Sequence, residues 1–147
     1  GGRSRVVKAP LERLPIFVRA GAVIPTQPVI QNTVEMRSVD VTLNVAAGIP
    51  AGQTMKSLLY QDAGDGYGYR SSEWQEVRIE HRQGILKMIR DGNYVGQPIR
   101  SLEIVGLTAQ PKELRANGNI IEFTFDSGTW RMHAKLPENA NEITLIR

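Results

Sequence analysis

The segment VDVTLNV, residues 39–45, carries the pattern that decides the fold of this chain. Valine or leucine stands at every odd position of the segment, and a polar residue stands at every even position. Successive side chains of a β-strand point to opposite faces of its sheet. The alternation therefore predicts a strand with one face in a core and the other face in water.

The same alternation recurs along most of the chain and predicts further strands. They are expected at residues 57–61, 75–82, 85–90, 101–105, 120–125, 130–136 and 142–146. Turn signals such as Gln83-Gly84 and Asn117-Gly118 separate them, and hairpins are predicted over residues 74–90 and 120–136. Residues 110–116 fit neither a strand nor an amphipathic helix clearly. Short strands at regular spacing predict an all-β fold, an antiparallel β-sandwich.

Composition excludes several classes of protein. The chain has 147 residues, 41% of them hydrophobic, which is enough for one domain with its own core, or one domain plus a piece of a neighbour. It has no cysteine for a disulfide or a thiolate metal site. The net charge is only +3 and the basic residues are scattered, so no nucleic-acid partner is expected. No run of about 18 apolar residues exists, so no membrane partner is expected either.

The first residues differ from the rest. Four prolines, Pro10, Pro15, Pro25 and Pro28, interrupt an apolar stretch, and proline is confined to edge strands and crossing segments because it cannot donate to a sheet. Residues 27–38 are polar and predict a junction between two units. The start at Gly1, without an initiator methionine or a signal-peptide pattern, is interpreted as a start inside a longer protein. The compartment stays open between cytoplasmic and periplasmic or extracellular.

Candidate catalytic groups are few. His81 shares the phase of apolar Val77 and is expected to be half-buried, whereas His133 is expected to face water. Neither histidine has a neighbouring serine, cysteine or acid in the pattern of a triad. Two carboxylate pairs are spaced by three residues, which fixes no separation suited to glycoside hydrolysis. No catalytic residue is therefore predicted in this chain.

The segment LLYQDAGDGYGYR, residues 58–70, allows three interpretations. Aspartate and glycine favour turns that use positive φ, so Asp62, Gly64, Asp65 and Gly66 are predicted to form a structural turn. A calcium loop would need more oxygen ligands at alternate positions than the segment offers, so no metal or other cofactor is expected, and a calcium-stabilised sandwich stays an alternative.

A sugar-binding surface is the third interpretation of this segment. Tyr67, Tyr69 and Trp74 could stack on sugar rings, because aromatic rings combine an apolar face with a polar rim. A carbohydrate-binding module with an oligosaccharide partner is therefore a second alternative. The competing interpretation places Tyr60 and Trp74 in the core and packs the other tyrosine rings over the turn.

Two motifs resemble a known family. The stretch APLERLPIFVRAGAVIP, residues 9–25, resembles the segment that follows the catalytic barrel in glycoside hydrolase family 31, the α-glucosidase and α-xylosidase family. The stretch LYQDAGDGYGY, residues 59–69, resembles a second landmark of that family, L-Y-x-D-D-G-x-x-x-x-Y, in the expected order and at the expected distance. Ala63 stands where many members have a second aspartate, which weakens the calcium interpretation further.

The resemblance implies a place in a larger enzyme. Residues 1–30 would be the closing strands of an incomplete proximal C-terminal β-sandwich, residues 31–36 a junction, and residues 37–147 the distal C-terminal β-sandwich. The family's catalytic aspartates lie on a (β/α)₈ barrel of about 250 residues, which this chain cannot contain. The expected function is that of a non-catalytic C-terminal domain of a retaining α-glycosidase, with the catalytic barrel of the same parent chain as its partner. Arg19, inside an apolar run, is expected to find a carboxylate or carbonyl partner in a neighbouring domain.

Overall fold

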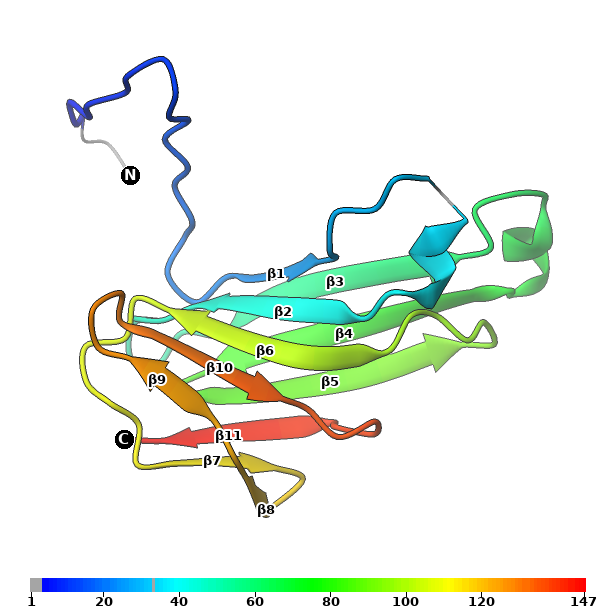
Figure 1. Cartoon of the computed structure of the whole chain (residues 1–147). Helices are drawn as coiled ribbons and strands as arrows, with labels where there is room; N and C mark the ends of the chain where they lie inside the picture. The colour runs from blue at the N-terminus through cyan, green and yellow to red at the C-terminus, as the bar shows by residue number, and fades with distance from the viewer. Residues whose placement is uncertain (1–3, 33) are drawn as a thin grey trace.

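The computed structural model describes residues 4–32 and 34–147, which form two β-sheets that face each other (Figure 1). The first sheet has the order β1-β2-β6-β10-β9 and the second has the order β3-β4-β5-β11-β7-β8. The predicted all-β sandwich is confirmed. In chain order the strands are β1 Val23–Thr26, β2 Val41–Ala46, β3 Met55–Asp62, β4 Trp74–Arg82, β5 Ile85–Gly92, β6 Ile99–Val105, β7 Glu113–Ala116, β8 Asn119–Ile121, β9 Thr124–Asp126, β10 Arg131–Lys135 and β11 Glu142–Ile146.

Helical structure is limited to two short 3₁₀ segments, η1 Glu35–Ser38 and η2 Gly68–Ser71, in the part of the chain that the structure describes. No helix formed by the described residues has the length and apolar character needed to cross a membrane. Neither 3₁₀ segment was predicted from the sequence, because three or four residues are too few to show a helical period.

The core lies between the sheets and follows the alternation in the sequence. Val41, Leu43 and Val45 of β2 are buried, and the polar residues between them are not. Full burial of one such side chain stabilises a fold by about 1.5–3 kcal/mol. The other large buried apolar side chains include Val77, Ile79, Leu86, Met88, Ile99, Leu102, Ile104, Leu114, Met132 and Ile143.

Among the described residues, strand pairing is antiparallel except between β2 and β6. Strands β2 and β6 pair in parallel, with a register shift between Val41 and Thr42. The predicted antiparallel arrangement is therefore wrong for this pair. The long excursion through β3, β4 and β5 in the opposite sheet separates β2 from β6, and a connection of that length allows a parallel neighbour.

One predicted hairpin is confirmed and one is only half right. Strands β4 and β5 pair antiparallel around Gln83 and Gly84, whose φ angles of 49° and 84° match a tight hairpin turn. The predicted strand at residues 120–125 breaks into β8, which pairs with β7 in one sheet, and β9, which pairs with β10 in the other. The chain changes sheets between them, as strands do at the corners of sandwiches.

The first thirty residues divide into a strand and an extended arm. Strand β1 pairs antiparallel with β2 and forms an edge of the first sheet, in keeping with Pro25 within it. Residues 4–20, here called the arm, contain no helix or strand and extend away from the sandwich (Figure 1). Strand β1 lies within residues 1–30 and pairs with β2, which follows the predicted junction at residues 31–36, so one sheet contains residues from both sides of that junction. The assignment of the three segments to separate units stays a prediction.

Candidate functional site

The glycine-rich loop after β3 is held by its own aspartates. The Gly64 N–H donates to Asp62 Oδ1 at 2.8 Å, and the Gly66 N–H donates to Asp65 Oδ1 at 2.7 Å. Both glycines have positive φ, 71° and 79°, which other residues adopt only at a cost. One oxygen of each carboxylate is therefore turned toward the backbone of the loop.

No metal-binding constellation accompanies this loop. Within residues 4–32 and 34–147, no three acidic or histidine side chains lie together in a way that could hold a metal ion. Calcium takes six to eight oxygen ligands. Among the described residues the calcium-stabilised alternative therefore has no cluster of three acidic side chains, and backbone carbonyls would have to supply the remaining protein ligands.

Tyr67 and Tyr69 lie together, but they form no flat platform. Their ring centroids are 6.4 Å apart and their planes are tilted by 50°. The Arg70 guanidinium carbon lies 4.6 Å from the Tyr67 ring centroid and 5.7 Å from that of Tyr69, within range of a cation–π contact with each. A sugar stacking on the face of Tyr67 that carries this contact would have to displace Arg70.

Trp74 is separate from the tyrosine pair. A Cβ atom on Gly92 would come 2.8 Å from Trp74 Cε3, so the indole packs over the glycine at the end of β5. Among the described residues, no aromatic ring pair joins Trp74 to either tyrosine. The structure brings Tyr67, Tyr69 and Arg70 together and leaves Trp74 half-buried at the start of β4.

Tyr60 lies on the outer face of its sheet, so the interpretation that places it in the core is wrong. Tyr60 is 46% exposed, because its neighbours Leu59 and Gln61 occupy the inward-facing positions of β3. Loss of solvent around the ring raises the pKa of Tyr60 above its ordinary value, and a hydrogen bond to Asp62 and the negative charges of Asp62 and Glu76 raise it further. The phenol therefore keeps its proton at neutral pH.

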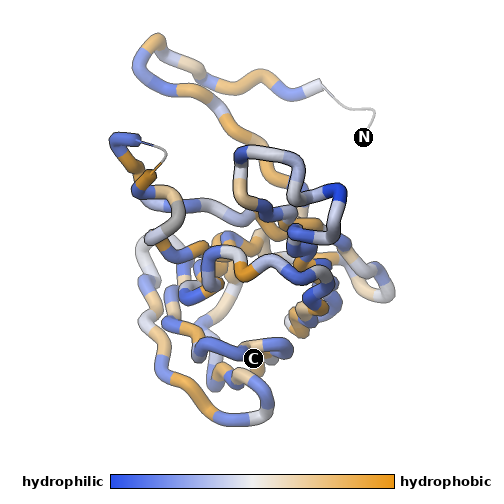
Figure 2. Tube along the Cα trace, turned by 90° about the vertical axis from the view of Figure 1, so that its right-hand side faces the viewer, coloured by the Kyte–Doolittle hydropathy of each residue, from blue (hydrophilic) through white to orange (hydrophobic). Residues whose placement is uncertain are grey.

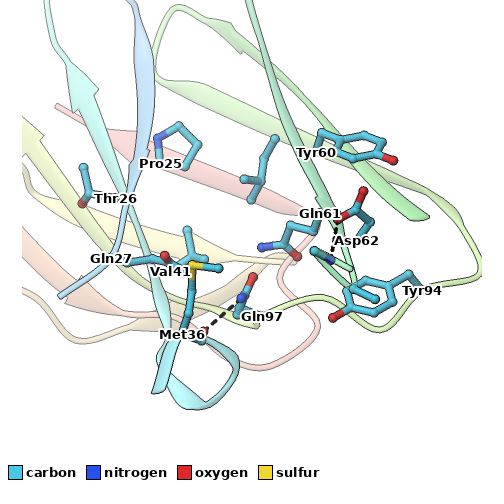
Figure 3. A pocket seen from close by; sticks show the side chains of 13 residues that line it. Pro25, Thr26, Gln27, Met36, Val41, Tyr60, Gln61, Asp62, Tyr94 and Gln97 are labelled. Carbon is cyan, nitrogen blue, oxygen red and sulfur yellow. Dashed lines mark hydrogen bonds between the residues drawn. The ribbon is translucent and has the colours of Figure 1, made fainter. Parts of the chain in front are cut away.

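A pocket of about 320 Å³ opens between β1 and β3, the edge strands of the two sheets (Figure 3). Gln61 projects from β3 into it and is only 8% exposed, yet its Oε1 has no hydrogen-bond partner. A buried acceptor without a partner costs about 1–3 kcal/mol. Gln61 was not predicted from the sequence as a site residue. A polar residue in the apolar phase of a predicted strand is the signal that could have found it.

The two histidines lie in different environments. His81 is 4% exposed, more buried than expected, and its Nδ1 lies 2.9 Å from the Gly21 carbonyl oxygen. A carbonyl only accepts, so Nδ1 carries the hydrogen in this contact. His133 on β10 is exposed, as predicted.

The arm meets the sandwich at Gly21. The Gly21 N–H donates to the Ala46 carbonyl at 2.9 Å, and the Ala22 N–H donates to the Arg19 carbonyl at 3.0 Å. Gly21 has a φ of 82°, and a Cβ atom there would lie 2.7 Å from Met55 Cγ, so only glycine fits without rearrangement. These contacts, with that of His81, fix the point at which the arm leaves β1.

The arm itself exposes large apolar side chains. Leu14 is 83% exposed and Phe17 is 75% exposed, and Figure 2 shows apolar residues along the arm away from the rest of the chain. Arg19 is also exposed, and within the described residues its side chain forms no ion pair or hydrogen bond to another side chain or carbonyl. The other large apolar residues exposed in this segment are Val6, Val7, Leu11, Ile16 and Val18.

Comparison with curated proteins identifies relatives that are much longer than this chain. An α-glucosidase of Schizosaccharomyces pombe is 32% identical over 123 residues, which cover 82% of this chain and 12% of that protein. Glucoamylase 1 of Candida albicans is 26% identical over 128 residues, which cover 86% of this chain and 13% of that protein. The chain thus spans about an eighth of the length of these relatives. No protein-family model matches it.

Solved structures share the fold over nearly the whole chain. The GH31 α-xylosidase from Xanthomonas citri is 27% identical with a TM-score of 0.62, and the match covers 100% of this chain and 15% of that one. The Flavobacterium johnsoniae GH31 dextranase complexed with glucose has a TM-score of 0.79 at 21% identity, and the match covers 96% of this chain and 21% of that one. The first extends the likeness to sequence, and the second concerns the fold alone.

Proposed function

We propose, with the homology of this chain to α-glucosidases of glycoside hydrolase family 31 as the premise, that it is a non-catalytic C-terminal β-sandwich of a retaining α-glycosidase. Its role is to support the catalytic barrel of the same parent protein. The linkage that the parent enzyme cleaves, that of an α-glucosidase or an α-xylosidase, remains open in this proposal.

The exposed apolar arm is the observation that carries the proposal. An exposed run of large apolar side chains marks an interaction surface, because soluble proteins seldom leave such a run uncovered. The arm is extended and carries Pro10 and Pro15, so it can lie against a sheet of a neighbouring unit. We infer that it packs against the parts of the parent protein that precede it, and that Arg19 pairs there with a carboxylate or carbonyl.

The joint at Gly21 supports a scaffold role. An arm that left the sandwich through a free linker would transmit no orientation to a neighbouring unit. Here the Gly21 N–H donates to the Ala46 carbonyl and the Ala46 N–H donates to the Ala22 carbonyl, so these two bonds and the His81 contact hold the end of the arm against β2 and β4. The sandwich would therefore be presented to the barrel in one orientation.

The placement of titratable groups supports a non-catalytic role. His81 is buried beneath the arm joint and His133 lies exposed on β10, in the opposite sheet. The Asp62 and Asp65 carboxylates each accept a hydrogen bond from the loop backbone. A glycosidase needs two carboxyl groups that face each other across a sugar, about 5–10 Å apart, with one of raised pKa.

Two measurements test the proposal. The chain alone should show no turnover of p-nitrophenyl α-glucoside, and turnover would contradict the non-catalytic role. In the full parent protein, Phe17→Asp should lower the melting temperature and reduce turnover, because it places a charge in the inferred interface. The control Thr108→Asp changes an exposed residue of the sandwich outside the arm and should do neither. Equal effects of the two variants would contradict the interface.

A further inference from the structure

We propose that the pocket between β1 and β3 binds a neutral, hydroxyl-rich molecule of the size of one sugar ring, with Gln61 as its central hydrogen-bonding group. Neither Tyr67 nor Tyr69 lines the pocket, and the inference stands independently of the scaffold role. It rests on the side chains that line the pocket and on its size.

Gln61 lies at an inward-facing position of β3, where the alternation of the strand predicts an apolar core residue. Leu59, in the same phase of β3, packs against the core cluster. Replacing such a position by an amide leaves one acceptor and two donors to satisfy. Figure 3 shows the Gln61 side chain directed from β3 toward Val41 and Gln97 across the pocket. Buried side-chain polar atoms nearly always have a partner, so an amide at a pocket wall whose Oε1 has none points to a ligand that supplies one.

The Gln61 amide can present either of its ends to a ligand. Oε1 now lies against Gly96, where a Cβ atom would come 1.6 Å from it. The terminal torsion of glutamine is broad and roughly two-fold, so half a turn exchanges Oε1 and the NH₂ group. Either orientation leaves one polar group of the amide facing the pocket, as an acceptor or as a donor to a hydroxyl.

The remaining lining residues favour a neutral ligand with one apolar face. Pro25, Val41 and Leu59 supply apolar walls, while Gln61, Gln97 and Thr26 supply amides and a hydroxyl. None of the described lining residues is basic, and the carboxylate of Asp62 already accepts the Gly64 N–H. A phosphate or carboxylate would find no counter-charge from these residues. A sugar ring, with apolar faces and hydroxyl edges, matches both kinds of wall.

The size of the pocket limits the ligand to one ring. Its volume of about 320 Å³ lies at the lower end of the range of small-molecule sites, about 300–1,000 Å³. A longer oligosaccharide would have to extend out of it past Tyr60 and Tyr94, which line it beside Asp62 (Figure 3).

Hydrogen bonds between the walls hold the pocket open before any ligand arrives. The Gln97 Nε2 donates to the Met36 carbonyl at 3.0 Å and ties η1 to the segment before β6. The Gln75 Nε2 donates to the Tyr94 carbonyl at 3.0 Å, and the Asn44 Nδ2 donates to Thr26 Oγ1 at 2.7 Å. A site that is already formed loses less conformational entropy on binding.

The test is calorimetric titration of the chain with D-glucose, maltose and D-glucuronate. Glucose should bind, and glucuronate, which keeps the ring and adds a negative charge, should bind at least about tenfold more weakly. Maltose at equal or higher affinity than glucose would assign the site to the end of an α-glucan. Glucose without maltose would assign it to a free monosaccharide. Absence of binding by both sugars would overturn the proposal, and so would glucuronate binding as tightly as glucose.

Two variants distinguish an effect on ligand binding in the pocket from an effect on the stability of the fold. Gln61→Leu keeps the size of the side chain and removes the amide, so glucose affinity should fall about tenfold, the effect of one lost hydrogen bond. Its melting temperature should not fall, because no buried polar atom is left without a partner. Gly96→Ala, whose φ is not positive, pushes Gln61 into the pocket and should also weaken binding. The control Tyr67→Ala lies outside the pocket and should bind glucose as the unchanged chain does. Unchanged affinity in both pocket variants would overturn the role of Gln61.

Discussion

The Nδ1 atom of His81 lies 2.9 Å from the carbonyl oxygen of Gly21, a residue sixty positions earlier in the chain. This contact joins β4, the second strand of one sheet, to the point where the arm meets β1, at the edge of the other sheet. Among the described residues it is the only buried side-chain hydrogen bond between the arm joint and the second sheet. The orientation of the arm thus depends on a residue that alternation alone would assign to the core.

Replacement of His81 should destabilise the fold. His81→Leu leaves the Gly21 carbonyl without this partner, at a cost of about 1–3 kcal/mol in the free energy of unfolding. Urea unfolding followed by circular dichroism measures the change. The control His133→Leu changes an exposed residue of β10 and should stay within about 0.5 kcal/mol of the unchanged chain. Equal stability of the two variants would mean that the contact contributes nothing.

Gly21→Ala should destabilise the fold more than Gly48→Ala. The two glycines have nearly the same φ, 82° and 83°, so the backbone cost of alanine, about 1–2 kcal/mol, is common to both. A Cβ atom on Gly21 would lie 2.7 Å from Met55 Cγ, whereas one on Gly48 meets nothing within 4 Å. The difference between the two melting temperatures therefore isolates the steric contact. A Gly48 variant as unstable as the Gly21 variant would contradict the close packing at the joint.

Asp126 should stabilise the folded chain above the pH at which it takes up a proton. A hydrogen bond from the Thr129 hydroxyl and another from the Gly128 N–H lower the pKa of Asp126 below its ordinary value of 3.8. A carboxyl whose pKa is lower in the folded state stabilises it above the unfolded pKa. This contribution is present above about pH 3.8 and is lost as the pH falls through the lower folded value.

Melting temperatures between pH 5 and pH 2 test this assignment. Thr129→Ala removes the hydroxyl that lowers the pKa most, so it should flatten the acid-side fall in stability. Thr108→Ala, an exposed control, should leave the slope unchanged. A steeper fall in the Thr129 variant than in the control would contradict the sign of the effect.

If Tyr67 and Tyr69 formed a sugar-binding surface, Tyr67→Ala would weaken retention on an oligosaccharide gel. The packing of Arg70 predicts the opposite result. Arg70 lies over the Tyr67 ring, so Tyr67→Ala should leave retention on an oligosaccharide gel unchanged. Retention that falls in Tyr67→Ala and rises in Arg70→Ala would instead show that sugars stack on this ring once the guanidinium is removed. The matched control is Ile120→Ala, which shortens an exposed residue that lies in neither the tyrosine pair nor the pocket.

The calcium alternative predicts a melting temperature that depends on a chelator. Asp62 and Asp65 each direct an oxygen to a backbone N–H, and we expect no change in melting temperature when EDTA is added. Magnesium in place of EDTA controls for ionic strength. A fall of several degrees that added calcium reverses would restore the calcium interpretation.

The sequence predicted most strands well, since alternation is a local property. It identified residues 39–45 and the hairpin of β4 and β5, where the residues that form the turn are adjacent in the chain. It did not identify β7, whose four residues are too few to show a period. It also predicted one strand at residues 120–125, because the alternation continues through the corner where the chain changes sheets.

Some features of the candidate sites likewise depend on neighbouring residues and could be predicted, whereas others depend on residues distant in the sequence. The Asp–Gly pairs of the loop after β3 were predicted as a turn from residue chemistry, and their hydrogen bonds span only one or two residues. The grouping of Tyr67 and Tyr69 with Arg70, and the separation of Trp74 from them, depend on η2 and on Gly92, which is remote in sequence. The pocket around Gln61 needs two edge strands from different sheets, so no single segment encodes it.

By itself the sequence determined that the chain is built from half-buried strands, and its motifs pointed to the family that the comparisons support. Alternation and turn chemistry act between near neighbours, so they can be read without the fold. Only the tertiary structure decided that β2 lies parallel to β6, that β1 closes the edge of the sheet, and that His81 holds Gly21. Those outcomes depend on which distant surfaces bury the most apolar area together, and a property of pairs of distant segments is not contained in either segment alone.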